Sequence, residues 1–294
     1  MNNTAFAQRA TDRKNRVYQR RLLTHRIGIA LSIAAMTVGL AFLLWILATL
    51  LTKGLGALSL PMFMADTPAP GSEGGGLRNA IVGSLMIVGL STLVSTPIGI
   101  FAGIYLAEYG HTNKFGQLTR FVTDIMLSAP SIVIGMFVWA MYVHAVGHYS
   151  GYAGSIALSL IAVPVVVRTT DNMLRLVPNS LLEAAFALGA PRWKVALMVR
   201  LRAVKAGVVT GVLLAVARVS GETAPLLFTA LNNQFFSADM NKPMANLPYV
   251  IYQFAMSPYD NWRELAWAGA LLVTFSVLAL NIISRTLFTQ KIPN

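Results

Sequence analysis

The chain contains no cysteine among its 294 residues, and only 12% of its residues are charged. Without cysteine it has neither a disulfide framework nor a thiolate ligand for a metal. A soluble globular domain typically carries about 25% charged residues, so we exclude that class. The Gly-x-x-x-x-Gly-Lys-[Ser/Thr] loop that cradles nucleotide phosphates is also missing. Hydrophobic residues, in contrast, make up 55% of the chain, and this composition indicates an integral membrane protein.

Histidine is scarce as well. The four histidines are His25, His111, His144 and His148. None has a carboxylate or a second histidine at a convincing ligand spacing, so the sequence predicts no metal site and no cofactor. The net charge of +12 is better explained by membrane topology than by nucleic-acid binding, because the basic residues gather on one side of the predicted spans.

Long uncharged runs predict the spans. Residues 27–51 form a run of 25 residues without a charge, and a spanning helix needs about 20. The run 125–167 is long enough for two spans, with a turn near 147–151. The other uncharged or nearly uncharged runs cover 79–107, 206–238 and 265–284. Because only helices or closed barrels satisfy the backbone in lipid, and the runs lack a period of two, we expect an all-α membrane protein with six spans.

Lysine and arginine indicate the orientation. They number 18 on one side of the predicted spans and four on the other, and the basic side is cytoplasmic in membrane proteins. Both termini are therefore predicted to be cytoplasmic. The expected segments are a basic N-terminal segment (1–26), a first transmembrane helix (27–51), an external loop (52–78), a core of the remaining spans (79–285) containing a long cytoplasmic loop (168–205), and a cytoplasmic tail (286–294).

The external loop 52–78 is rich in proline and glycine. This composition favours a flexible connector, and the alternative is a docking surface for an external partner. A second external loop, 232–262, carries aromatic residues that suit the membrane interface or a partner.

The cytoplasmic loop 168–205 contains a pattern typical of a short helix. Asn179 or Ser180 is expected to cap it, and Glu183 is expected in its first turn, where the helix dipole favours an anion. Ala184 and Ala185, small residues with high helix propensity, would let another surface approach closely. A glycine, Gly189, then allows the chain to reverse.

This segment resembles the EAA loop of ABC-transporter permeases. The residues that match are Glu183, Ala184, Ala185, Gly189, Val199 and Leu201, whereas Arg202 stands where the family has a proline. In that family the helix inserts into a groove on a cytoplasmic ATPase subunit. Four further segments, 73–77, 103–109, 127–133 and 221–228, resemble the PstA family of permease subunits of bacterial phosphate ABC importers, over nearly the whole chain.

The resemblance implies a MetI-like ABC permease core preceded by one extra N-terminal helix, in the bacterial cytoplasmic (inner) membrane. It also implies a PstC-like permease as heterodimer partner, a PstB-like ATPase dimer and a PstS-like phosphate-binding protein. The chain itself would not be an enzyme, since ATP would be hydrolysed in the separate subunit.

Two charged residues interrupt the run 206–238. Arg218 and Glu222 are four residues apart and are expected on one helix face. Charges inside a membrane are costly and normally face a cavity or a partner, so the pair either lines an anion pathway or locks two helices together. A guanidinium matches a tetrahedral oxyanion, and a protonated phosphate can donate a hydrogen bond to Glu222, which sulfate cannot. Thr223 and Arg168 are the other predicted pathway residues.

Three alternatives remain at this point. One is a permease for another oxyanion, such as sulfate or molybdate. The second is an ion-coupled secondary carrier that works without ATP. The third, a membrane enzyme acting on lipid phosphates, is disfavoured because the spans lack clustered His, Asp and Glu.

Overall fold

The computed structural model describes residues 3–72, 74–110 and 113–288. His111, position 73 of the segment 73–77 and most of the predicted tail lie outside these residues. The chain forms two units, Met1–Thr52 and Lys53–Asn294, here called unit 1 and unit 2. Each is described by itself.

Unit 1 contains most of a single helix, α1 (Asn3–Ala57), which continues into unit 2. Its segment Tyr18–Ala57 is long and apolar enough to cross a membrane, and it contains the predicted span 27–51. At 1.5 Å per residue the 55 residues of α1 reach about 80 Å, well beyond a hydrocarbon core of about 30 Å. The helix therefore extends through the predicted basic segment.

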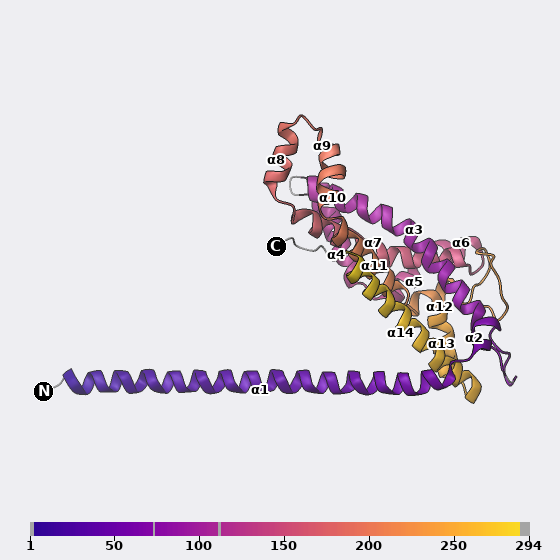
Figure 1. Ribbon diagram of the computed structural model, residues 1–294, viewed down its shortest axis with the longest axis horizontal. Coiled ribbons are helices and arrows are strands. Elements are labelled where there is room, and N and C mark those ends of the chain that lie inside the picture. Colours follow the sequence, from indigo (N-terminus) through magenta and orange to yellow (C-terminus); the bar gives the residue numbers. More distant parts are fainter. Residues whose placement is uncertain (1–2, 73, 111–112, 289–294) are drawn as a thin grey trace. The chain divides into compact units, whose positions relative to one another are not determined.

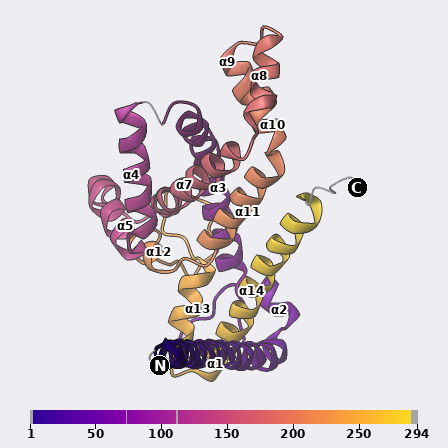
Figure 2. The ribbon, with the colours of Figure 1, turned by 90° about the vertical axis from the view of Figure 1, so that its left-hand side faces the viewer.

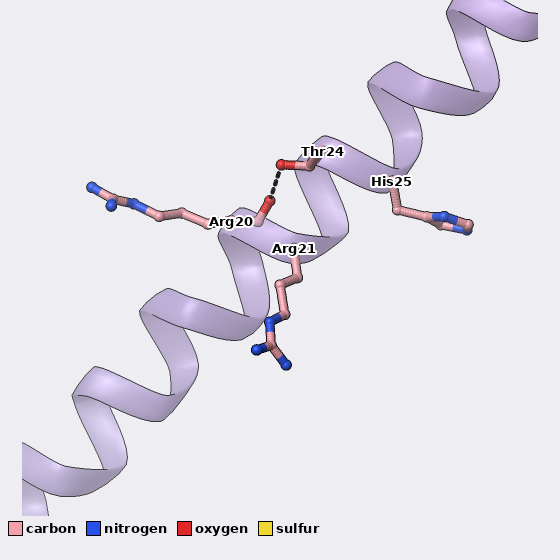
Figure 3. A pocket seen from close by; sticks show the side chains of 4 residues that line it. All are labelled: Arg20, Arg21, Thr24 and His25. Carbon is pink, nitrogen blue, oxygen red and sulfur yellow. Dashed lines mark hydrogen bonds between the residues drawn. The ribbon is translucent and has the colours of Figure 1, made fainter.

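A shallow hollow on α1 is lined by Arg20, Arg21, Thr24 and His25. Figure 3 shows these side chains leaving one helix in different directions, with the Thr24 hydroxyl donating to the Arg20 carbonyl at 2.9 Å. No second element contributes to the hollow, so it does not form a site.

Unit 2 is helical throughout its regular elements (Figure 1). Its helices are α2 (Leu60–Met64), α3 (Arg78–Tyr109), α4 (Lys114–Ser128), α5 (Ser131–Val138), the π-helix η1 (Trp139–Val143), α6 (His144–Val146), α7 (Gly151–Arg175), α8 (Asn179–Ala187), α9 (Arg192–Lys194), the π-helix η2 (Val195–Arg200), α10 (Leu201–Ala203), α11 (Lys205–Val219), α12 (Ala224–Thr229), α13 (Leu247–Ala255) and α14 (Asp260–Phe288). In Figures 1 and 2 alike, α8 and α9 lie at one end of unit 2, and α2 and α13 lie toward the other. We call these the α8 end and the α2 end.

The predicted count of six spans is not confirmed. Among the described residues, four helices are long and apolar enough to cross a membrane: Tyr18–Ala57, Arg78–Tyr109, Gly151–Arg175 and Asp260–Ile283. A fifth span forms only if Lys114–Ser128 and Ser131–Val146 are counted together, and these two segments are bent by 106°. The turn expected near 147–151 is present, with Gly147 at a φ of 84°.

The bend has a local cause in the chain. Ala129 and Pro130 between α4 and α5 are extended, with ψ values of 135° and 131°. A proline disfavours the helical conformation of the residue before it, so α4 ends there and α5 starts in a new direction.

The run 206–238 also differs from a single straight span. Helix α11 has 15 residues, about 22 Å long, and ends at Val219. A short break follows, and Pro225 lies in the first turn of α12, where its missing N–H has no helical partner to lose. The proline therefore starts a helix instead of kinking one.

The core of unit 2 is built on close contact between α3 and α7. A Cβ placed on Gly99 would lie 2.5 Å from Val166 Cβ, and one on Gly103 would lie 2.6 Å from Thr170 Cβ. Across the same contact, Ser155 Oγ donates to the Ile87 carbonyl at 3.2 Å. Small residues that let backbones approach are typical of helix packing in membranes.

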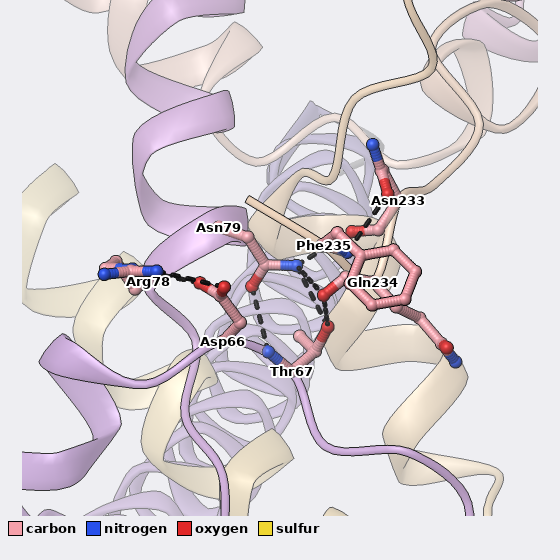
Figure 4. Close-up of polar contacts among 7 residues, drawn as sticks. All are labelled: Asp66, Thr67, Arg78, Asn79, Asn233, Gln234 and Phe235. Atoms are coloured by element: carbon pink, nitrogen blue, oxygen red, sulfur yellow. Dashed lines mark hydrogen bonds and ion pairs between the residues drawn. The ribbon is translucent and has the colours of Figure 1, made fainter. Parts of the chain in front are cut away.

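The loop 52–78 is folded, which corrects the expectation of a flexible connector. Met62 and Leu77 are fully buried, and the Leu77 N–H donates to the Met62 carbonyl at 2.7 Å. Asp66 and Arg78 form a two-point ion pair with distances of 3.0 Å (Figure 4). The buried Asn79 donates to Thr67 Oγ1 at 2.9 Å and to the carbonyl of Asn233 at 2.8 Å. These bonds tie the loop to the distant segment 232–246.

Candidate functional site

The predicted coupling helix is present as α8 and ends at a glycine. Gly189 has a φ of 79°, and nothing lies within 4 Å of a Cβ placed on it. The Gly189 N–H donates to the Phe186 carbonyl at 2.9 Å, and the Ala190 N–H donates to the Ala185 carbonyl at 3.2 Å. This pair of bonds is the Schellman motif. Gly189 therefore reverses the chain as expected.

The start of α8 differs from the prediction. Pro178 occupies the N-cap position, and no side chain caps the helix there. Asn179 and Ser180 are already helical because the fixed φ of the proline sets the entry one residue earlier. Glu183 consequently lies beyond the first turn.

No residue of α8 is buried within the chain. Leu181 and Phe186 are exposed, and Leu188 just after the helix is 89% exposed. Trp193, on the far side of the Gly189 turn, is exposed as well. Exposed apolar residues that gather in this way at the α8 end of unit 2 make it a candidate interaction surface.

A cluster of charged residues that was not predicted from the sequence lies where α7 leads into the loop 168–205. Asp171 on α7 is 2% exposed, and both of its carboxylate oxygens contact Arg175, at 2.9 and 3.0 Å. Arg120 on α4 approaches the same carboxylate at 3.4 Å and donates to the Leu106 carbonyl of α3 at 2.8 Å. The cluster thus joins three helices. Its only signal in the sequence was Asp171 among many basic residues.

Arg168 forms an ion pair that the sequence did not reveal. Its Nη1 lies 3.3 Å from Asp124 Oδ1 on α4, and both side chains are about half exposed. Its neighbour Thr169 donates to the Val165 carbonyl at 2.9 Å and so remains bonded to its own helix. Asp124 escaped notice because it lies 44 residues from Arg168 in the sequence.

Arg218 and Glu222 do form a pair, but not on one continuous helix. Arg218 lies in the last turn of α11, whereas Glu222 and Thr223 lie in the break before α12. Arg218 Nε and Glu222 Oε1 are 3.8 Å apart, and the two side chains are 45% and 18% exposed. The expectation of a shared helix face is therefore wrong, because the helix ends between them.

The two predicted arginines belong to separate ion pairs on adjacent helices. Helix α11 packs against α7, and a Cβ on Gly211 would lie 2.5 Å from Thr169 Oγ1. Arg218 lies seven residues beyond Gly211, about 10 Å along the helix. Arg168 directly precedes Thr169, so the two cations lie at different heights of the α7–α11 pair.

Comparison with known proteins identifies the class. Residues 95–290 match the family described as "Binding-protein-dependent transport system inner membrane component". The match covers more than half of the chain, so the chain belongs to this family of ABC-transporter permeases. It is a multi-pass inner-membrane component, and a permease of this kind works with a substrate-binding protein and an ATPase.

Within the class, the relatives point to one group. The chain is 60% identical over 271 residues to the phosphate transport system permease protein PstA of Pasteurella multocida, covering 92% of this chain and 96% of the relative. It is 58% identical to PstA of Haemophilus influenzae, covering 96% and 99%. PstA 1 of Mycobacterium tuberculosis is 32% identical, covering 90% and 88%. These matches place the chain among the PstA permeases.

Solved structures support the fold. A chain of the inward-facing MetNI methionine ABC transporter matches with a TM-score of 0.57 at 18% identity, covering 71% of this chain and 94% of that one. A chain of a bacterial alginate ABC transporter matches with a TM-score of 0.60 at 15% identity, covering 90% and 96%. The MetI-like, all-α permease fold predicted from the sequence is confirmed.

Proposed function

We propose that this chain is the membrane-spanning permease subunit of an ATP-driven phosphate importer. The observation that carries the proposal is its identity of 60% to a relative named as a phosphate transport permease, over 96% of that relative's length. The exposed helix α8, matching the EAA loop, supports coupling to a separate ATPase.

Phosphate passes between this chain and a homologous PstC-like permease. Arg218, Glu222 and Thr223 line the path at the α11–α12 break, and Arg168 lines it nearer the α8 end. Each arginine side chain is 45% exposed, which supports this placement. An exposed cation inside a membrane protein needs water or an anion beside it. The helix is interrupted at 220–223, between α11 and α12, and discontinuous helices of this kind form substrate sites in other transporters.

A PstB-like ATPase dimer drives the cycle through α8. Glu183, Ala184 and Ala185 form the face that enters the ATPase groove, and Gly189 reverses the chain behind it. The absence of any buried residue in α8 supports docking on another subunit. A PstS-like protein delivers phosphate at the α2 end, and both termini and the loop 168–205 are cytoplasmic.

The deciding experiment is co-purification followed by transport. The chain and its permease partner are isolated with and without the candidate ATPase and reconstituted into vesicles, with ATP on the cytoplasmic side and the phosphate-loaded PstS-like protein on the other side. Phosphate uptake is expected only with the ATPase, and an ATPase variant unable to hydrolyse ATP is the matched control.

Two results would contradict the proposal. Uptake driven by an ion gradient without the ATPase would indicate a secondary carrier. Stronger competition by sulfate or molybdate than by phosphate would indicate a permease for another oxyanion.

A further inference from the structure

One buried arginine holds η2, the part of the loop 168–205 that leads from α8 and α9 toward α11. Arg200, the last residue of η2, is only 9% exposed. Its Nη1 donates to Glu108 Oε1 at 2.7 Å, and its Nε donates to the Leu174 carbonyl at 2.9 Å. Glu108 lies near the end of α3, and Leu174 lies near the end of α7. One side chain thus joins η2 to two spanning helices.

The surroundings make this joint sensitive to change. Ile104, Ala107, Leu174 and Ala196 form a buried apolar cluster between α3, α7 and η2. In such a place, removing one partner of an ion pair leaves an uncompensated charge. A planar guanidinium reaches two acceptors in fixed directions, whereas a lysine ammonium on a flexible stem does not reproduce that fork.

The joint lies between α8 and the rest of unit 2. Helix α8 has no buried residue and packs against η2. A displacement of α8 therefore reaches α7 along the short link 176–178, and it reaches both α3 and α7 through η2 and its anchor. Beyond the anchor, α7 carries Arg168 and packs against α11, which carries Arg218.

We propose that Arg200 and Glu108 are positioning residues that transmit displacement of α8 to α3 and α7. The proposal rests on the proposed function, in which α8 receives the ATPase. Neither residue contacts the anion. Their ion pair ties η2 to the end of α3, and the hydrogen bond from Arg200 to the Leu174 carbonyl ties η2 to the end of α7. Docking at α8 and the arrangement of the pathway helices therefore change together.

The test uses the assembled transporter in vesicles with Arg200→Gln or Glu108→Gln. ATP hydrolysis is measured with and without phosphate-loaded binding protein, and phosphate uptake is measured per ATP hydrolysed. Basal hydrolysis and assembly are expected to persist, while stimulation and uptake per ATP fall roughly tenfold, within the range for coupling residues. Arg263→Gln is the control, because it removes one partner of an exposed ion pair in unit 2.

A second measurement follows the joint directly. Since the chain has no cysteine, Leu188→Cys and Phe101→Cys can carry spin labels at two exposed positions, one beside α8 and one on α3. A narrow distance distribution is expected with native Arg200 and a broad one with Arg200→Gln. The double reversal Glu108→Arg with Arg200→Glu restores the ion pair but not the donor to Leu174, so it should recover part of the coupling.

Several outcomes would overturn the proposal. Unchanged stimulation and an unchanged distance distribution in Arg200→Gln would show that the joint transmits nothing. Failure of the near-isosteric Glu108→Gln to accumulate would give the pair a folding role only. If phosphate does not stimulate the native complex, the proposed function fails, whereas the spin-label distances still test the joint.

Discussion

Arg218 and Glu222 form an ion pair that is long and open. At 3.8 Å, with 45% of the arginine side chain exposed, the contact leaves most guanidinium donors available. A tight structural lock would instead bury both groups with further hydrogen bonds. An arginine fork beside a carboxylate suits an oxyanion that still carries a proton, and phosphate meets that condition at neutral pH.

We expect the double change Arg218→Gln with Glu222→Gln to abolish phosphate uptake while subunit levels stay normal. The neutral pair removes a costly charge pair and keeps polar groups that bond across helices. Uptake is measured in cells lacking other phosphate carriers, with membrane levels checked in parallel.

The control for this experiment is Asp239→Asn with Lys242→Gln, which neutralises an exposed pair of similar length, 3.6 Å. Near-normal uptake in the Gln–Gln variant would assign Arg218 and Glu222 to packing. Arg218→Lys should also be impaired, because a point charge lacks the planar fork.

At the scale of elements, α8 depends on the turn that follows it. Gly189 adopts a left-handed conformation with open space around it. A substitution there therefore acts through backbone strain before it acts through crowding.

Gly189→Val is expected to reduce uptake and stimulated ATP hydrolysis strongly while the protein remains in the membrane. The left-handed conformation costs an ordinary residue about 1–2 kcal/mol, so the end of α8 should rearrange. Gly189→Asn is the matched control, since asparagine tolerates this conformation, and it should retain most activity. Equal activity of the two variants would show that the turn is not needed for coupling.

The contact between α3 and α7 allows a second comparison, on one helix. Gly99 has Val166 Cβ at 2.5 Å from the position of an added Cβ, whereas Gly89 has nothing within 4 Å. Gly99→Leu should destabilise unit 2 by about 1–3 kcal/mol through overpacking, and Gly89→Leu should not. Thermal unfolding in detergent measures both, and equal losses would place α3 differently against α7.

For the whole molecule, topology is the property most open to direct test. We expect a cysteine introduced at Ser72 to react with an impermeant reagent from outside, and one at Leu188 to react only after the membrane is opened. Both positions are exposed, and the native chain contributes no cysteine background. The reverse pattern would invert the orientation inferred from the lysine and arginine count.

The sequence alone determined the class of the protein. Low charge, long apolar runs and basic residues on one side of the spans are properties of local composition. They predict the fold class because, in a membrane, only helices or closed barrels pair all the backbone N–H and C=O groups. The EAA-like segment and the turn at Gly189 were predictable for the same reason, since a short helix and its glycine depend on neighbouring residues.

The tertiary structure decided which charges meet and where the spans break. Asp124 with Arg168, and Glu108 with Arg200, are separated by 44 and 92 positions, and only the packing of α4 on α7 and of η2 on α3 brings them together. The folded loop 52–78 likewise depends on Asn79 reaching the distant Asn233. Composition cannot report such pairs, because their energy arises from burial and geometry that exist only once the helices have packed.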